Sequence, residues 1–200
     1  EENFHGYFWG TLEASHPEAR NYKRFGVPDN WQAWGKWDER FDIVKEPNEA
    51  NRFGWVVEID PFDPNSVPKK RTALGRFKHE GAAGITNRDG RYVVYSGDDE
   101  RFEYVYKFVT EARLDTQNPY TNRDILDRGI LYVAKYNADG SGEWMPLVHG
   151  SGPLNAVNGF DSQADILIEC RRAGDLLGAT KMDRPEDVEA NPLTQKVYVM

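Results

Sequence analysis

The chain has 200 residues, with 33 acidic and 25 basic side chains and a net charge of −8. This acidity argues against a nucleic-acid partner, because phosphate binding needs clustered Lys and Arg. No apolar run is long enough to span a bilayer, so no membrane partner is expected either. With Cys170 as the one cysteine, neither an internal disulfide nor a cysteine zinc cluster can form. The 18 Gly, 11 Pro and 13% aromatic residues favour a β-rich fold with many turns.

Residues 1–50 show no sustained period of 2 or 3.6, which predicts long loops with one short helix. Four of the six tryptophans lie here, namely Trp9, Trp31, Trp34 and Trp37. We expect them to pack the loops onto a neighbouring sheet rather than to bind a ligand. Residues 1–50 are therefore interpreted as a loop-rich insertion, separate from the β-rich residues 51–200.

Strand patterns begin at residue 52 and are joined by tight turns, which indicates antiparallel sheets. Asp-Gly turns at 87–90 and 137–140 predict two hairpins. Residues 161–177 have helical spacing and a candidate cap at Asp161 or Ser162, which predicts one helix. The predicted strands are 52–59, 72–77, 83–86, 91–95, 102–109, 130–136 and 142–147, with further strand at Val188 and over 197–200.

The chain contains an internal repeat. In each copy a glutamate, Glu80 or Glu186, precedes a short strand, and a turn containing Asn follows. A basic residue, Arg91 or Lys196, then begins a strand of Val and Tyr. Two such copies are typical of two blades of a β-propeller, in which the first strand of each blade lines the central channel. Glu80 and Glu186 would then face the axis.

Carboxylates gathered on an axis repel one another unless a cation or proton lies between them. A metal held by Glu80 and Glu186 is one interpretation, and hydrogen bonds from each Glu to backbone amides are the other. Arg184 could bind an anionic substrate through its planar guanidinium, or it and His79 could form surface salt bridges. The acidic run 97–101 could bind calcium, although a charged loop is the commoner explanation. No nucleophile elbow, phosphate-binding loop or paired-histidine motif is present.

Six segments together resemble the PhoX family of alkaline phosphatases. The most specific are Phe77-Lys-His-Glu-Gly-Ala82 and Asp183-Arg-Pro-Glu186. These two motifs lie in the segments 70–82 and 178–187, and the other four segments are 1–8, 54–64, 95–104 and 131–136. The resemblance covers nearly the whole chain.

The resemblance implies part of a six-bladed β-propeller, mostly β with long loops and one or two short helices, exported to the periplasm or secreted. It also implies hydrolysis of small phosphate monoesters by a calcium and iron cluster. Glu80 and Glu186 resemble metal ligands, and Glu1 and Glu2 are candidate ligands beside them. Arg184 resembles the catalytic residue that holds the substrate phosphate.

His79, next to Glu80, is a further candidate for substrate binding by the same resemblance. The family's iron-binding cysteine would precede Glu1, and Cys170 does not occupy that position. Other ligands, with the remainder of the propeller, are expected beyond Met200. Residues 1–200 alone are therefore expected to have little or no phosphatase activity.

Two other functions remain open from the residues. One is a calcium-dependent propeller hydrolase of the regucalcin or gluconolactonase kind, and the other is a non-catalytic propeller scaffold. The Arg beside the second glutamate favours an anionic substrate, hence the phosphatase. A scaffold would leave Glu80 and Glu186 apart, each bonded to backbone.

Overall fold

The computed structural model describes all 200 residues, which form two compact units, Glu1–Gly54 and Trp55–Met200. We refer to them as unit 1 and unit 2 and describe each by itself. The interpretation from sequence placed the division between residues 50 and 51, and the contacts place it after Gly54. None of the helices combines the length and the apolar character that a membrane crossing requires.

Unit 1 contains helical turns and loops but no strand. Its α-helix is α1 (Ala19–Phe25), which ends at Gly26 in the left-handed conformation that favours glycine. The 3-10 helices are η1 (Phe4–Tyr7), η2 (Trp34–Lys36), η3 (Glu39–Phe41) and η4 (Glu49–Arg52). Fully buried Phe4, Phe8, Tyr22 and Phe25 form its core. The expectation of loops with one short helix is confirmed.

The expected packing is wrong for Trp31 and Trp37, while Trp9 is half-buried. Trp31 and Trp37 are 67% and 88% exposed, and Trp34 is 41% exposed. Trp34 stacks on Tyr7 with ring centroids 4.3 Å apart, so part of its surface is covered within unit 1. The phenylalanines and Tyr22 fill the core, and the indoles of Trp31 and Trp37 lie at the surface.

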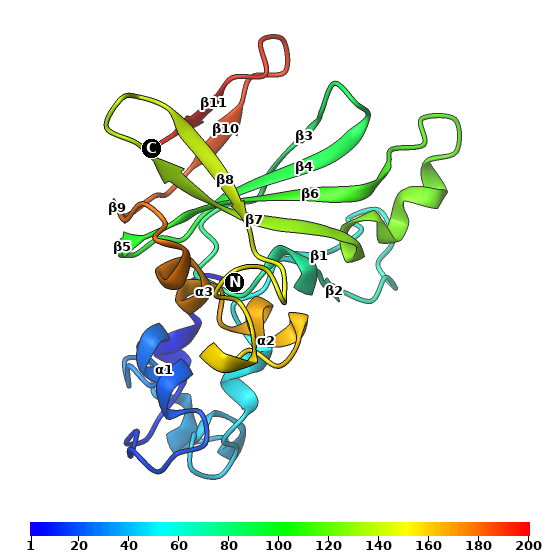
Figure 1. Cartoon of the computed structure of the whole chain (residues 1–200). Coiled ribbons are helices and arrows are strands. Elements are labelled where there is room, and N and C mark those ends of the chain that lie inside the picture. Colours follow the sequence, from blue (N-terminus) through cyan, green and yellow to red (C-terminus); the bar gives the residue numbers. More distant parts are fainter. The chain divides into compact units, whose positions relative to one another are not determined.

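Unit 2 is built on a five-stranded antiparallel sheet with the order β3-β4-β6-β7-β8 (Figure 1). The turns at 87–90 and 137–140 join β3 to β4 and β7 to β8, so both predicted hairpins are confirmed. The strands are β3 (Ala83–Thr86), β4 (Arg91–Gly97), β6 (Val105–Arg113), β7 (Gly129–Tyr136) and β8 (Gly142–Pro146).

The remaining strands form three two-stranded pairs. They are β1 (Val57–Glu58) with β2 (Lys69–Lys70), β5 (Arg101–Glu103) with β9 (Met182–Asp183), and β10 (Val188–Ala190) with β11 (Val197–Val199). Both copies of the sequence repeat therefore form antiparallel hairpins, β3–β4 and β10–β11. The mostly β, antiparallel character is as expected, but the sheets do not close into a ring.

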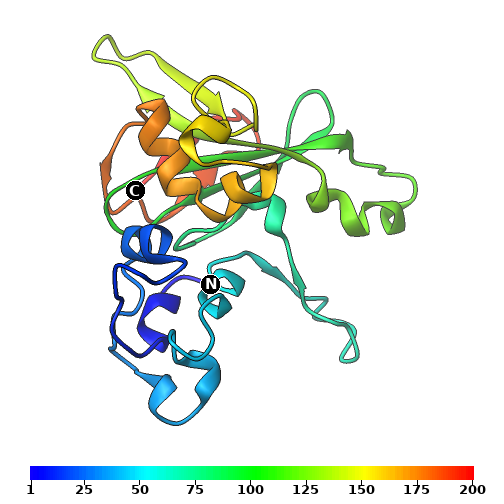
Figure 2. The ribbon, with the colours of Figure 1, turned by 60° about the horizontal axis from the view of Figure 1, so that its bottom comes forward.

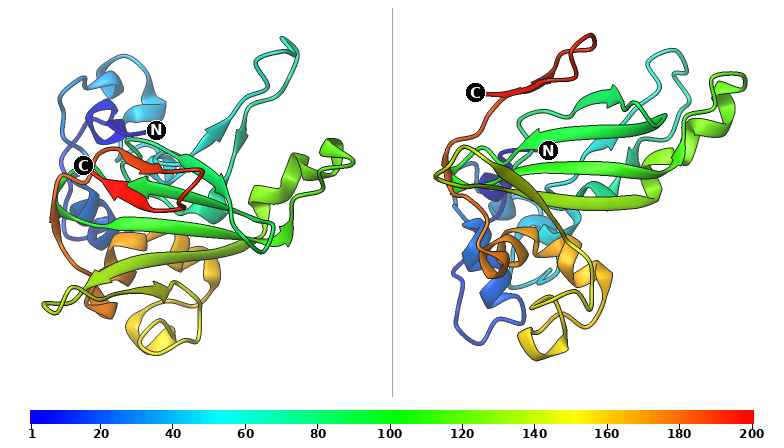
Figure 3. Two further views of the ribbon diagram at one scale, coloured as in Figure 1. Left: turned by 90° about the horizontal axis from the view of Figure 1, so that it is seen from above. Right: turned by 45° about the horizontal axis from the view of Figure 1, so that its top comes forward.

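The two faces of the five-stranded sheet are covered differently. Helices α2 (Gln163–Ile168) and α3 (Cys170–Leu177) cross one face, as Figure 2 shows. The hairpin β10–β11 lies on the other face (Figure 3), where Val188 packs with Val105 and Ala134. Gly174 of α3 lies so close to Tyr104 that an added Cβ would be 3.0 Å from its ring. Tyr104, just before β6, and Val105, its first residue, thus pack into opposite layers.

Three predicted elements differ in the structure. Residues 72–77 form the 3-10 helix η5 (Thr72–Leu74) and a loop instead of a strand, and 52–59 contributes only β1. The helix over 161–177 is two helices, because Glu169 leaves helical geometry with ψ 42°. Ser162 caps α2 in a capping box with Asp165, as its position predicted. The other 3-10 helices are η6 (Pro119–Asp127) and η7 (Ala156–Asn158).

Candidate functional site

In unit 2, residues 78–80, which precede β3, run alongside residues 97–99 at the end of β4. His79 forms an antiparallel bridge with Asp98. The amide of Asp99 donates to the Lys78 carbonyl at 3.0 Å, and the amide of Glu80 donates to the Gly97 carbonyl at 3.4 Å. These backbone bonds place Glu80 and Asp99 on neighbouring strands of chain.

A third segment, the Arg-Pro-Glu motif of the second repeat, approaches the same place. A Cβ on Gly97 would lie 2.0 Å from the Pro185 carbonyl oxygen and 2.5 Å from that of Glu186. Only glycine permits this approach of backbone to backbone. The amide of Glu186 donates to the Met200 carbonyl at 2.9 Å, which fixes the motif to the end of β11.

Arg184 lies between two carboxylates. Its Nε and Nη2 donate to the two oxygens of Asp99 at 2.9 and 2.8 Å, and Nη2 is 2.9 Å from Glu186 Oε1. Nη1 has no partner, and the side chain is 52% exposed. The hydrogen bond to Asp99 raises the pKa of Arg184, and the charges of Glu186 and Glu80 act in the same direction.

The backbone of Arg184 is in the left-handed region, with φ 57°. This conformation costs a residue with a side chain on the order of 1 kcal/mol, and such residues are found preferentially at functional sites.

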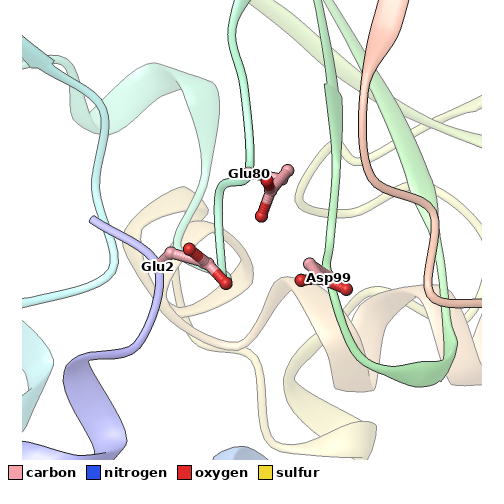
Figure 4. A group of neighbouring side chains, drawn as sticks. All are labelled: Glu2, Glu80 and Asp99. Carbon is pink, nitrogen blue, oxygen red and sulfur yellow. The ribbon is translucent and has the colours of Figure 1, made fainter.

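Glu80 completes the group. An oxygen of its exposed carboxylate lies within 4.8 Å of an oxygen of Asp99, and Figure 4 shows both side chains. The cluster therefore holds three carboxylates, Glu80, Asp99 and Glu186, and Arg184 pairs with the last two. Carboxylate oxygens are the donors that a hard cation such as calcium prefers.

This cluster occurs in a chain with clear relatives. The sequence profile described as alkaline phosphatase PhoX matches residues 1–200. The chain belongs to this family. A comparison with curated proteins returned no match.

Among solved structures, the chain is similar to Pseudomonas fluorescens PhoX in complex with vanadate, a transition-state analogue. The identity is 50% and the TM-score is 0.93 over all of this chain, which spans 36% of that protein. The resemblance found in the motifs is thereby confirmed.

Of the residues that the PhoX resemblance singles out, Glu80, Arg184 and Glu186 come together in unit 2. His79 is adjacent in sequence but is turned into the core, where it is 7% exposed. Its Nδ1 and Nε2 lie 2.9 Å from Ser96 Oγ and from the Gly75 carbonyl oxygen. Its ring also stacks on Phe77 at 3.7 Å. With both nitrogens bonded to protein, no ring nitrogen is available to a phosphate in this conformation.

The two N-terminal candidates belong to unit 1. The Glu1 carboxylate accepts a hydrogen bond from the Gly54 amide at 3.1 Å. Glu2 is half-buried, and its carbonyl accepts from the Phe4 amide at 2.9 Å. Glu2 is the third side chain drawn in Figure 4.

Cys170 behaves as a buried apolar residue. It is fully buried, and burial raises the pKa of its thiol to about 12. A thiol held protonated in this way is a poor metal ligand.

The acidic run 97–101 has a structural role that sequence patterns did not assign. Asp98, Asp99 and Glu100 each pair with a basic side chain, so the run is not an open calcium loop. Asp99 in particular was missed as the partner of Arg184. Its one signal was its place in the acidic run, and nothing in the spacing links it to a residue so far along the chain.

Proposed function

We propose that the protein is a metal-dependent phosphate monoester hydrolase in which Arg184 binds the phosphoryl group. The main support is the geometry of Arg184, whose side chain is 52% exposed and whose Nη1 is unpartnered while Asp99 holds the other edge of the guanidinium. The P. fluorescens relative carries a transition-state analogue, which is consistent with phosphoryl chemistry in this family.

Arg184 can donate from Nη1 to a phosphoryl oxygen without leaving Asp99. Negative charge on the equatorial oxygens changes as the phosphoryl group is transferred, and a donor fixed beforehand stabilises that charge. Asp99 and Glu186 keep the guanidinium in one orientation, so little side-chain freedom is lost when the substrate binds.

Glu80 and Glu186 are the proposed metal ligands, with Asp99 at the edge of the same group. Their carboxylate oxygens fit calcium, and iron is proposed by family resemblance together with ligands outside residues 1–200. A bound cation would neutralise phosphoryl oxygens and supply Lewis acidity. Glu1 and Glu2 remain proposed ligands. His79 remains a proposed substrate-binding residue only if its ring turns out of the core.

The alternatives rest on less. A scaffold would leave each glutamate bonded to backbone, whereas the Glu186 carboxylate contacts Arg184. A lactonase does not need a cationic side chain positioned to bind an anionic group.

We further propose that unit 2 is part of a six-bladed propeller, because hairpins β3–β4 and β10–β11 repeat with a glutamate before each. Export to the periplasm or beyond is proposed on family resemblance, and cell fractionation tests it.

The test uses the protein expressed from its complete gene and assayed on p-nitrophenyl phosphate with calcium and iron. We expect turnover that vanadate inhibits and that a chelator abolishes, and elemental analysis should find both metals. Absence of turnover with both metals bound would contradict the proposed function. The purified chain of residues 1–200 should show little activity in the same assay, and robust turnover by it would contradict an incomplete site.

A further inference from the structure

A buried ion pair lies directly behind the site. Arg171 of α3 is 1% exposed and contacts Asp98, which is fully buried. Its Nε donates to Asp98 Oδ2 at 2.8 Å and its Nη2 donates to Oδ1 at 2.6 Å. This two-point contact fixes the Asp98 carboxylate in both position and plane.

The pair is part of a larger network that ties α3 to the loop after β4. Arg171 Nη1 donates to Glu100 Oε2 at 2.7 Å, and Lys78 Nζ lies 2.9 Å from the same oxygen. Burial would raise the pKa of Glu100, but Arg171 and Lys78 outweigh it and the pKa is lowered. The amide of Lys78 also donates to Asp98 Oδ1 at 3.2 Å. The loop 97–100 is therefore anchored on its inner side by several charged contacts.

Asp98 and Asp99 are consecutive residues with opposite tasks. The Asp98 side chain points inward to Arg171, and the Asp99 side chain holds Arg184 at the surface. Consecutive side chains of an extended segment point to opposite faces, so fixing one sets the direction of the next. Displacement of Asp98 would therefore move Asp99 and the guanidinium bonded to it.

We propose that Asp98 and Arg171 are positioning residues that act on phosphate binding through Asp99 and Arg184. Neither touches the substrate. The pair holds Asp99 in the direction that keeps the Arg184 fork in place while Nη1 is available to a phosphoryl oxygen. This inference rests on the proposed function of Arg184 and adds the buried Asp98–Arg171 pair that orients its side chain.

The experiment uses the protein from its complete gene, with Asp98→Asn as the main variant. Asparagine keeps the shape of the side chain but removes its charge, which weakens the two-point contact with Arg171. We expect a roughly tenfold or greater rise in the inhibition constant of inorganic phosphate, and a similar fall in kcat/KM for p-nitrophenyl phosphate. Arg171→Lys keeps the charge but cannot contact both oxygens, so it should give a smaller effect of the same kind.

A double-mutant cycle separates positioning from general loss of structure. In an Arg184→Ala background, Asp98→Asn should cause no further rise in the phosphate inhibition constant. If the rise in the phosphate inhibition constant in the double variant equals the product of the rises in the two single variants, the proposal is overturned. The matched control is Asp127→Asn, because Asp127 pairs at 2.7 Å with another buried arginine, Arg71, which has no contact with Arg184. That variant should leave the inhibition constant unchanged.

A second readout does not depend on activity. The Arg184 Nε–H is hydrogen-bonded to Asp99, so its ¹⁵N-arginine NMR signal, assigned with Arg184→Lys, should exchange slowly with water. Asp98→Asn should accelerate that exchange at least tenfold, whereas Asp127→Asn should not. An unchanged signal in Asp98→Asn would overturn the positioning role. Wild-type protein that shows this protection but no hydrolysis would contradict the proposed function alone.

Discussion

Arg184 and Asp99 are 85 positions apart in the chain, yet they form a two-point ion pair at the surface of unit 2. The pair occupies one edge of the guanidinium and leaves Nη1 open. The Arg184 side chain is 52% exposed, whereas that of Asp99 is only 5% exposed, so the pair supplies hydrogen bonds to a nearly buried carboxylate. Its importance lies in orientation, and the predictions below test that role and its surroundings.

In the protein expressed from its complete gene, Arg184→Lys should reduce the proposed phosphatase activity without unfolding the chain. Lysine keeps the positive charge but cannot bond Asp99 at two points and a phosphoryl oxygen as well. We expect kcat/KM for p-nitrophenyl phosphate to fall about 10- to 100-fold, equivalent to about 1.4–2.7 kcal/mol of transition-state stabilisation. Steady-state kinetics measure this. Arg101→Lys, at a 76% exposed arginine of β5, is the control and should match wild type.

Gly97→Ala should destabilise the protein and lower its activity together. The new methyl group would overlap the carbonyl oxygens of Pro185 and Glu186, so the Arg-Pro-Glu segment must move away. We expect a loss of about 1–3 kcal/mol in the free energy of unfolding, measured by urea titration.

Gly81→Ala is the matched control for that substitution. Its Cβ would meet only Asp187 Oδ1, at 3.9 Å, which is ordinary contact. The added methyl group would overlap backbone atoms in Gly97→Ala but not in Gly81→Ala. Equal stability and activity of both would show that the close approach at Gly97 does not hold the segment in place.

Glu80→Gln should weaken calcium binding. Removing one of the three clustered carboxylates lowers the attraction for a cation. It also lowers the repulsion among the carboxylates, so a bound cation relieves less unfavourable energy. In wild type, calcium should raise the melting temperature, and Glu80→Gln should need at least about tenfold more calcium for the same rise. Differential scanning calorimetry across a calcium series measures this. Glu189→Gln, on the exposed side of β10, should behave as wild type.

His79 should make the protein less stable in mild acid. Burial lowers the pKa of His79 to about 3, although its bond to the Gly75 carbonyl acts in the opposite direction. The unfolded chain, with a histidine pKa near 6.5, therefore binds more protons than the folded state between about pH 3 and 6.5. Stability from the neutral ring is complete above that range and is lost as the pH falls through it.

The His79 contribution can be isolated by difference. Between pH 7.5 and pH 5 we expect about 2 kcal/mol of stability to be lost through this group. His79→Gln should lack that part of the pH dependence, whereas His149→Gln, at an exposed histidine, should retain it. Urea unfolding at the two pH values measures both. The same pH dependence in wild type and His79→Gln would mean that the ring titrates normally.

Local pattern was sufficient for much of the fold. Asp-Gly turns identified the hairpins β3–β4 and β7–β8, because positive φ at these positions depends on the residues of the turn itself. The strand predicted at 72–77 failed because its apolar residues pack as the 3-10 helix η5 beneath the sheet. The helix predicted over 161–177 is divided at Glu169, whose φ of −107° and ψ of 42° leave helical geometry.

The sequence by itself determined the family, the two hairpin repeats and the candidates Glu80, Arg184 and Glu186, since each is carried by residues adjacent in the chain. Only the tertiary structure decided that His79 turns inward, that Asp99 holds Arg184, and that Arg171 anchors Asp98. These pairings join segments about 70 or more residues apart or depend on which face of a strand is buried. Such contacts are set by the folding of the whole sheet against α3 and the β10–β11 hairpin, and no local spacing encodes them.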